Sequence, residues 1–229
     1  MKLSVSAFLL VACSLCAAPN PPGDVVFKPT FLTGYDSLTA GTGFLVRIDG
    51  APVFVTAHHL FGPAAGLERD LSPTEAKNFV SALAASSMDH PSLILVSSEM
   101  MFIPAAKAFD QRDAAHDIAA FRLSNYHGAT LVISAVSPKV GEKVYLLARP
   151  RGEQELRLLS AVVSRVGKAS IEYSYDQSGM NLAGTSGAPI LNDKGEVVAI
   201  NLGGGDLKGK VFGFGNPSTS FVALLSNAQ

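Results

Sequence analysis

The sequence contains no tryptophan, few charged residues and only two cysteines, and these shortages exclude several classes of protein. Charged residues make up 16% of the 229 residues and hydrophobic residues 48%, which excludes a disordered chain, because disordered chains are polar and highly charged. The 18 basic and 19 acidic residues leave a net charge of -1. Nucleic-acid-binding proteins carry a positive surplus, so we expect no nucleic-acid partner.

Apolar runs long enough to cross a bilayer are also missing. The longest run, Leu3 to Leu15, is interrupted by serines and falls short of the roughly 20 residues that a spanning helix needs. It follows Lys2 and leads into small residues and the proline-rich segment Pro19–Gly23, a pattern typical of an export signal. We therefore interpret residues 1–18 as an export signal and expect an exported protein, secreted or periplasmic.

Both cysteines, Cys13 and Cys16, lie inside this segment, so removal of the signal leaves a chain without disulfides. The tetrapeptide ending at Cys13 is similar to a bacterial lipobox, and in that alternative Cys13 carries a lipid. We expect membrane contact only in that case. A second alternative is that the apolar run forms a buried N-terminal strand.

Short β-rich runs separated by glycine, proline, asparagine and aspartate fill the rest of the chain, which contains 21 glycines and 13 prolines. Asp49-Gly50 and Asn192–Gly195 are typical of hairpin turns. Many short strands with such turns favour an all-β barrel or sandwich. The expected strands are Gly43–Ile48, Val53–Thr56, Leu93–Ser97, Ile118–Leu123, Lys143–Ala148, Leu158–Val166, Ser170–Tyr175, Pro189–Leu191, Val197–Asn201 and Val211–Phe214.

One helix interrupts the strands. Ser72-Pro73-Thr74-Glu75 has the pattern of a capping box with proline at the first helical position, and apolar residues follow at helical spacing. This predicts a surface helix over Pro73–Ala85. A second, shorter helix is expected from Ser218 to Leu225.

Three short motifs carry chemistry when they occur together in this order. They are Val53–His58 preceded by Gly41–Phe44, then His116–Ala119, then Gly184–Pro189. A serine hydroxyl needs an adjacent base to act as a nucleophile, and a neutral imidazole can take its proton and return it to the leaving amine. A buried carboxylate holds the imidazole in the required tautomer.

These motifs resemble those of the trypsin-like (chymotrypsin-fold) serine peptidases. The segments Gly195–Asn201 and Phe212–Pro217 are similar to the bacterial HtrA-type and glutamyl-endopeptidase-like branch. The resemblance implies His58 as base, Asp117 as its orienting carboxylate and Ser186 as nucleophile, with the N–H groups of Gly184 and Ser186 forming the oxyanion hole. His59, the neighbour of His58, is the alternative base.

The same resemblance implies an all-β fold of two six-stranded antiparallel barrels. We expect the N-terminal barrel over residues 19–127, with His58 and Asp117, and the C-terminal barrel over residues 128–229, with Ser186. Since the chain stops at Gln229, we expect no PDZ domain. Thr185 stands where digestive relatives carry aspartate.

The pocket for the residue on the acyl side of the cut bond follows from the resemblance too. Its segments contain no acidic residue, so we expect cleavage after apolar or small uncharged residues of a protein or peptide substrate. No cofactor or metal is expected, and the sequence predicts no oligomeric state. The implied pocket residues are Met180, Asn181, Leu202, Gly203, Gly204, Gly215 and Asn216.

Two readings from other classes compete with a peptidase. One is a catalytically silent, exported binding protein on the same scaffold. The other is a metal site, whose ligands would be His58, His59, Asp113, His116 and Asp117. An α/β-hydrolase is excluded because no histidine follows Ser186.

Overall fold

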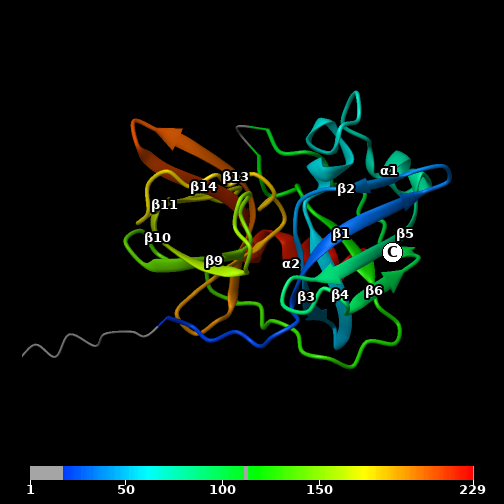
Figure 1. Cartoon of the computed structure of the whole chain (residues 1–229), viewed down its shortest axis with the longest axis horizontal. Helices are drawn as coiled ribbons and strands as arrows, with labels where there is room; N and C mark the ends of the chain where they lie inside the picture. Colours follow the sequence, from blue (N-terminus) through cyan, green and yellow to red (C-terminus); the bar gives the residue numbers. More distant parts are fainter. Residues whose placement is uncertain (1–17, 111–112, 229) are drawn as a thin grey trace, which may run out of the picture.

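The computed structural model describes residues 18–110 and 113–228. The interpreted export signal, with Cys13 and Cys16, lies outside the described residues except for Ala18. Figure 1 shows two β-structures side by side, the first built from the N-terminal half of the chain and the second from the C-terminal half.

The first structure is an eight-stranded antiparallel sheet. Its strands follow the order β6-β5-β1-β3-β4-β8-β7, and β2 pairs with β1. The hairpin between β3 and β4 closes at Asp49-Gly50, where both residues have positive φ (50° and 82°), as a type I′ turn requires. The strands are β1 (Val26–Thr33), β2 (Ser37–Thr39), β3 (Gly43–Ile48), β4 (Ala51–Thr56), β5 (Val80–Ser87), β6 (Ile94–Ser97), β7 (Glu99–Met100) and β8 (Ala119–Arg122).

The second structure is a closed barrel of six strands in the order β10-β11-β14-β13-β12-β9. The all-β, double-barrel prediction is therefore confirmed, although the first unit has eight strands where six were expected. The strands of the closed barrel are β9 (Lys143–Ala148), β10 (Arg157–Val166), β11 (Ile171–Tyr175), β12 (Pro189–Leu191), β13 (Val197–Leu207) and β14 (Lys210–Pro217).

The predicted surface helix is wrong in its second half. Helix α1 (Pro73–Phe79) begins with the expected capping box, in which Ser72 accepts from the Glu75 N–H, but it ends at Phe79. The chain continues as β5, where Leu83, Ala85 and Ser87 are buried at every second position and pair with β1. Sheet pairing with a distant strand thus overrides the helical spacing of the apolar residues.

Helix α2 (Ser218–Ser226) follows β14, as expected, and packs against β13, β14 and β3. Its buried residues Phe221 and Leu225 belong to the hydrophobic cluster of the first sheet. Neither α1 nor α2, in the part of the chain that the structure describes, has the length and apolarity of a membrane-spanning helix.

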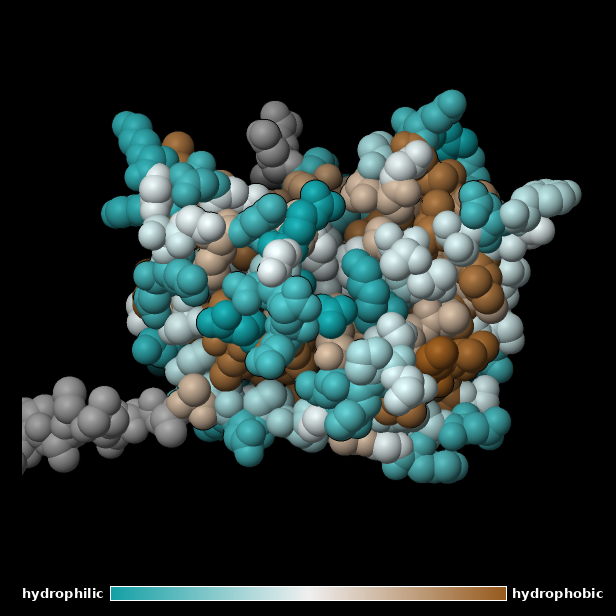
Figure 2. All heavy atoms as spheres, viewed as in Figure 1, coloured by the Kyte–Doolittle hydropathy of each residue, from teal (hydrophilic) through white to brown (hydrophobic). Residues whose placement is uncertain are grey.

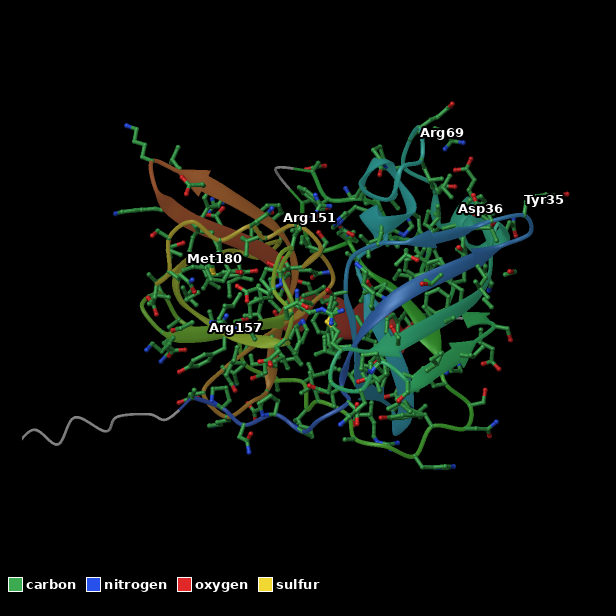
Figure 3. The ribbon with its side chains drawn as sticks, in the orientation of Figure 1. Tyr35, Asp36, Arg69, Arg151, Arg157 and Met180 are labelled. Carbon is green, nitrogen blue, oxygen red and sulfur yellow. The ribbon has the colours of Figure 1, made fainter. Side chains whose placement is uncertain are left out.

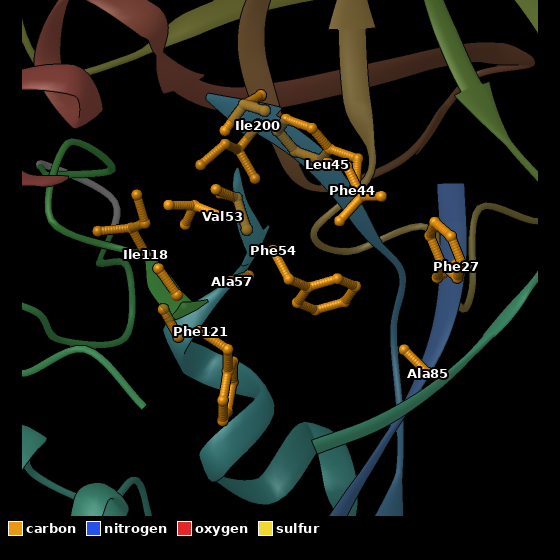
Figure 4. Close-up of a cluster of buried hydrophobic side chains, with 14 of the residues drawn as sticks. Phe27, Phe44, Leu45, Val53, Phe54, Ala57, Ala85, Ile118, Phe121 and Ile200 are labelled. Carbon is orange, nitrogen blue, oxygen red and sulfur yellow. The ribbon is translucent and has the colours of Figure 1, made fainter. Parts of the chain in front are cut away.

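One hydrophobic cluster crosses the boundary between the two units. Phe31, Phe61 and Phe121 form its aromatic centre, with ring centroids 4.8 Å apart for Phe31–Phe61 and 6.0 Å apart for Phe31–Phe121. Ile200, on β13 of the closed barrel, lies in the same cluster, close to Leu45 in Figure 4. The two units therefore share a packed interior, which fixes the loops at their boundary.

Candidate active site

A buried histidine–carboxylate pair lies at the end of the first sheet, and its histidine is His59. The Nδ1 atom of His59 lies 2.7 Å from Oδ2 of Asp117, and the His59 backbone N–H donates to Oδ1 at 3.0 Å. Asp117 is fully buried and His59 is 7% exposed. Because a carboxylate only accepts, Nδ1 carries the proton, which leaves Nε2 of His59 free to act as a base.

His58, the base that the motif suggested, does not contact Asp117. Its Nε2 lies 2.8 Å from the Leu71 carbonyl oxygen, so this nitrogen is the donor, and its ring packs edge-on against Phe61. The pKa of His58 is lowered, mainly by burial, and the lowered pKa keeps the imidazole ring neutral. The structure thus corrects the predicted His58–Asp117 pair to His59–Asp117.

Residues from both units hold the Asp117 carboxylate and its segment in place. The Phe109 N–H donates to Oδ2 at 3.1 Å, and the Phe109 ring packs edge-on against His59 with centroids 5.4 Å apart. From β14, the buried Asn216 side-chain amide donates to the Ala115 carbonyl at 2.9 Å and contacts the Asp117 carbonyl at 3.4 Å. The Asp117 carboxylate therefore accepts three N–H groups, two from His59 and one from Phe109, which fix its position.

Ser186 stands at the corner between two successive tight turns. Thr185 N–H donates to the Leu182 carbonyl at 3.1 Å, and Ala188 N–H donates to the Thr185 carbonyl at 3.0 Å. The third residue of each turn is a glycine with positive φ, Gly184 at 87° and Gly187 at 88°, as type II turns require. The N–H groups of Gly184 and Ser186 donate to no group among the described residues, so both are available to an oxyanion.

The Ser186 hydroxyl donates to the Leu202 carbonyl at 3.1 Å, and no hydrogen bond joins it to His59 within the described ranges. In unliganded sites such bonds often form only with substrate.

The nucleophile loop, residues 182–188 around the predicted nucleophile Ser186, is bound to the first sheet through Thr42. The Thr42 N–H donates to the Ser186 carbonyl at 2.8 Å, and its hydroxyl donates to the Gly184 carbonyl at 2.7 Å. A Cβ atom on Gly187 would lie 2.1 Å from the Thr42 carbonyl oxygen, so only glycine fits at this crossing. These contacts hold the peptide groups that directly follow the two carrying the free N–H donors.

A buried hydrogen-bond network supports the same loop from the closed barrel. The side-chain amide of Asn201 donates to both the carbonyl and the hydroxyl of Thr185, each at 3.0 Å. Its oxygen accepts from the Tyr173 hydroxyl at 2.5 Å. Thr185, Asn201 and Tyr173 are all fully buried. A neutral network thus holds the residue next to the nucleophile, where the sequence has no acidic residue.

A cavity of about 550 Å³ opens beside Ser186. It is lined by residues 179–184, 186 and 203–206, so Met180, Asn181, Gly203 and Gly204 lie where the sequence predicted pocket residues. Leu182 narrows it: its Cδ1 lies 2.7 Å from where a Cβ on Gly204 would stand.

Three expected pocket residues do not line this cavity. Leu202 is buried, Gly215 lies inside the β13–β14 ladder, and Asn216 faces the Asp117 segment. Asp206, expected outside, lines the cavity instead. Its side chain is exposed and accepts from the Gly209 N–H at 2.8 Å, so it is not a buried acidic base for Lys or Arg.

The alternative metal site has no support from the geometry of its members. His116 Nδ1 lies 2.7 Å from Asp113, whereas His59 pairs with Asp117 and His58 with Leu71. Within residues 18–110 and 113–228, no three such side chains gather as metal ligands.

The family model for the trypsin-like peptidase domain matches residues 41–200, a range that includes His59, Asp117 and Ser186. The chain belongs to the trypsin-like peptidase family. A comparison with curated proteins gave no match.

Solved structures similar to this peptidase are HtrA-type and related proteases. The active form of the Rv3671c protease from M. tuberculosis is 16% identical, with a TM-score of 0.59, and the match covers 98% of this chain and 93% of that one. The serine endoprotease from Yersinia pestis is also 16% identical (TM-score 0.59; 89% and 62% covered). The HtrA-type protease AlgW is 14% identical (TM-score 0.59; 89% and 60% covered). At these identities the likeness concerns the fold.

Sequence reasoning about this peptidase preferred His58 and kept His59 only as the alternative base, and it gave no role to Thr42 or Asn201. The two histidines lie in a 3₁₀ turn, His58–Phe61, in which successive side chains point about 120° apart, so only one can face Asp117. The choice depends on where β4 ends and the turn begins. Thr42 belongs to the Gly41–Phe44 motif. Asn201 is an asparagine among apolar strand residues, and this unusual position indicates a buried polar contact.

Proposed function

We propose that this trypsin-like serine peptidase is an exported endopeptidase that works through His59, Asp117 and Ser186. The observation that carries the proposal is the buried His59–Asp117 pair, with Nδ1 and Oδ2 2.7 Å apart, at the boundary where the Ser186 loop presents the free N–H groups of Gly184 and Ser186. The pair supplies an oriented base and the loop supplies a nucleophile and an oxyanion site. Together these groups are sufficient for acyl transfer.

In the first half of the reaction, Ser186 Oγ attacks the substrate carbonyl carbon while its proton passes to Nε2 of His59. Asp117 stabilises the imidazolium that forms, through the Nδ1–H bond. The negative charge that develops on the carbonyl oxygen accepts the N–H groups of Gly184 and Ser186. His59 then gives its proton to the leaving amine, the C–N bond breaks, and an acyl-enzyme is left.

In the second half, water replaces the amine. His59 takes a proton from water, the resulting hydroxide attacks the acyl carbon, and the proton returns to Ser186 Oγ as the carboxylic product leaves.

We propose that the residue on the acyl side of the cut bond is small and uncharged. Met180 and Leu182 give the cavity apolar walls, and Leu182 lies across from Gly204 and narrows it. A buried lysine or arginine side chain would need a buried carboxylate, and the one acidic residue lining the cavity, Asp206, is exposed. We also propose export, on the pattern of residues 1–18, with a lipid anchor only if Cys13 is modified.

Labelling with a fluorophosphonate probe tests the site, because such probes react quickly only with an activated serine. We expect labelling of the purified protein without its first 18 residues, and none for Ser186→Ala. For His59→Ala, peptide hydrolysis should fall by roughly 10⁴- to 10⁶-fold.

His58→Gln is the matched control. The glutamine amide can still donate to the Leu71 carbonyl, so labelling and hydrolysis should stay within about threefold of wild type, because the bond to Leu71 is structural. The assignment is wrong if His59→Ala retains activity while His58→Gln loses it. A protein that is folded yet unreactive would instead be a silent binding protein.

A further inference from the structure

Three basic side chains from two separate segments gather beside the nucleophile loop. Lys28 lies on β1, Arg149 directly follows β9, and Arg151 lies two residues further on. Burial lowers the pKa of Lys28, and the nearby charges of Arg149 and Arg151 lower it further. Arg149 and Arg151 therefore lie close enough to Lys28 for their charges to act on it.

No carboxylate neutralises this basic cluster. Across the described residues, some cations form ion pairs, for example Arg157 with Glu153 at 3.0 Å and Arg69 with Glu75 at 2.6 Å. Lys28, Arg149 and Arg151 form none; Lys28 Nζ instead donates to the Gly41 carbonyl at 3.0 Å. Holding like charges together costs free energy, and an anion that binds among them recovers it.

The cluster adjoins the nucleophile loop on two sides. A Cβ on Gly41 would lie 2.7 Å from the Ser186 carbonyl oxygen, so the residue that anchors Lys28 touches the nucleophile. On the other side, Arg151 N–H donates to the Ala183 carbonyl at 3.1 Å, next to Gly184. Figure 3 places Arg151 beside the boundary of the two units, where hydrophilic side chains gather on the face seen in Figure 2.

The basic cluster lies outside the cavity that receives the acyl side of the substrate. That cavity is lined by residues 179–184, 186 and 203–206, and none of the three cations is among them. Gly41 adjoins Ser186 but does not line the cavity, so we infer that an extended substrate that fills the cavity and crosses Ser186 continues over the Gly41 side. Its leaving-group part therefore passes the basic cluster.

We propose that Lys28, Arg149 and Arg151 form a carboxylate-binding subsite for the leaving-group side of the substrate. The inference rests on the proposed function and names its substrate class: peptides with a carboxylate within the first residues after the cut bond. An arginine fork binds a carboxylate in a bidentate manner, and Arg151 is exposed and available for this. The carboxylate is either an acidic side chain or the C-terminus of the leaving segment.

Matched quenched-fluorescent peptides test the subsite. They share one acyl-side sequence and carry Glu, Ala or Lys at each of the first three positions after the cut, with the C-terminus either free or amidated. We expect kcat/KM for the best Glu peptide to exceed that of its Lys counterpart by roughly 10-fold or more, since hydrogen bonds to charged groups contribute at least that factor. If the preference for a carboxylate persists in amidated peptides, the subsite binds the acidic side chain. If the preference requires a free C-terminus, the subsite binds the terminal carboxylate.

Arg151→Gln should remove about 10-fold of the preference for the carboxylate and leave the amidated Ala peptide, which has no carboxylate after the cut, unchanged. Arg149→Gln should act in the same direction, and Lys28→Met too if it folds. The control is Arg157→Gln, which removes an exposed arginine of the same barrel that already pairs with Glu153. The subsite is refuted if the wild type cleaves Glu and Lys peptides equally and free and amidated peptides equally, or if Arg151→Gln loses equally on every peptide, including the amidated Ala peptide.

Binding separates this proposal from the proposed function. The anisotropy of a fluorescent leaving-segment peptide reports the subsite without turnover, and Arg151→Gln should weaken the Glu form about 10-fold. If the Glu and Lys forms of the peptide bind with equal affinity, and the free and amidated forms do too, the subsite is refuted even when the peptidase is active. Absence of probe labelling and cleavage overturns the catalytic assignment even when charge-selective binding is found.

Discussion

Replacing Asn201 by leucine should both destabilise the protein and loosen the nucleophile loop. The side-chain amide of Asn201 makes three buried hydrogen bonds, two donated to Thr185 and one accepted from Tyr173. At about 1 kcal/mol each, their loss costs about 3 kcal/mol. The former partners of Asn201 keep other hydrogen bonds, because the Thr185 carbonyl also accepts from the Ala188 N–H and the Tyr173 hydroxyl lies 3.3 Å from the Phe214 carbonyl. The substitution therefore avoids the full free-energy cost of leaving buried polar groups without a partner.

Thermal unfolding measures this cost. For a chain of this length, about 3 kcal/mol corresponds to a fall in Tm of about 6–12 °C. Tyr173→Phe removes only one of the three bonds and should lower Tm by about a third as much. The exposed Asn125→Leu is the control and should leave Tm unchanged to within about 2 °C.

Catalytic positioning is measured on the same variants. Since small misplacements of reacting groups are costly, the rate of fluorophosphonate labelling should fall about 10- to 100-fold in Asn201→Leu. The reasoning is refuted if Asn201→Leu melts and labels like the wild type. If Asn201→Leu does not fold, Tyr173→Phe decides: unchanged Tm and labelling would show that the network does not hold the loop.

Three further outcomes are expected. Gly187→Ala should cost about 2 kcal/mol or more in urea unfolding and abolish labelling, because its φ is 88° and the new Cβ would meet the Thr42 carbonyl; wild-type stability would contradict this. Burial raises the pKa of Tyr173 and Tyr175, so above a pH of about 10 these two side chains ionise only in the unfolded state. The stability of the protein should therefore fall as the pH rises above about 10, and the absorbance of the two tyrosinates should appear only on unfolding. Burial lowers the pKa of His58, so stability should fall as pH drops below about 6.5, and His58→Gln should flatten that slope in unfolding measured at several pH values.

Turn chemistry made much of the fold predictable. Asp49-Gly50 fixes a hairpin by backbone geometry alone, and the capping box at Ser72 marks the start of a helix. The end of that helix was not predictable locally. Residues 80–87 satisfy a helical spacing, yet they form a strand because β1, some 50 residues earlier, pairs with them along its length. β1 itself carried no turn signal strong enough to reveal it.

Residue types and chain order indicated the site, and local geometry then decided its members. The roles proposed for Asp117 and Ser186 come from motifs whose chemistry leaves little choice. His58 and His59 have the same chemistry, and only the direction of each ring separates them: one faces the Leu71 carbonyl, the other the Asp117 carboxylate. The Thr42 contacts join residues more than 140 positions apart, so no local pattern contains them.

The crossing between Thr42 and the Ser186 loop bears on how the protein withstands its own activity. A molecule whose two units separated would lose these bonds and would part His59 and Asp117 from Ser186, so it would no longer be an enzyme while its loops became cleavable. Self-digestion then needs a second, closed molecule to cut an opened one. Its rate should rise with the square of the protein concentration and become negligible in dilute solution, where opened molecules close again before they meet a closed one.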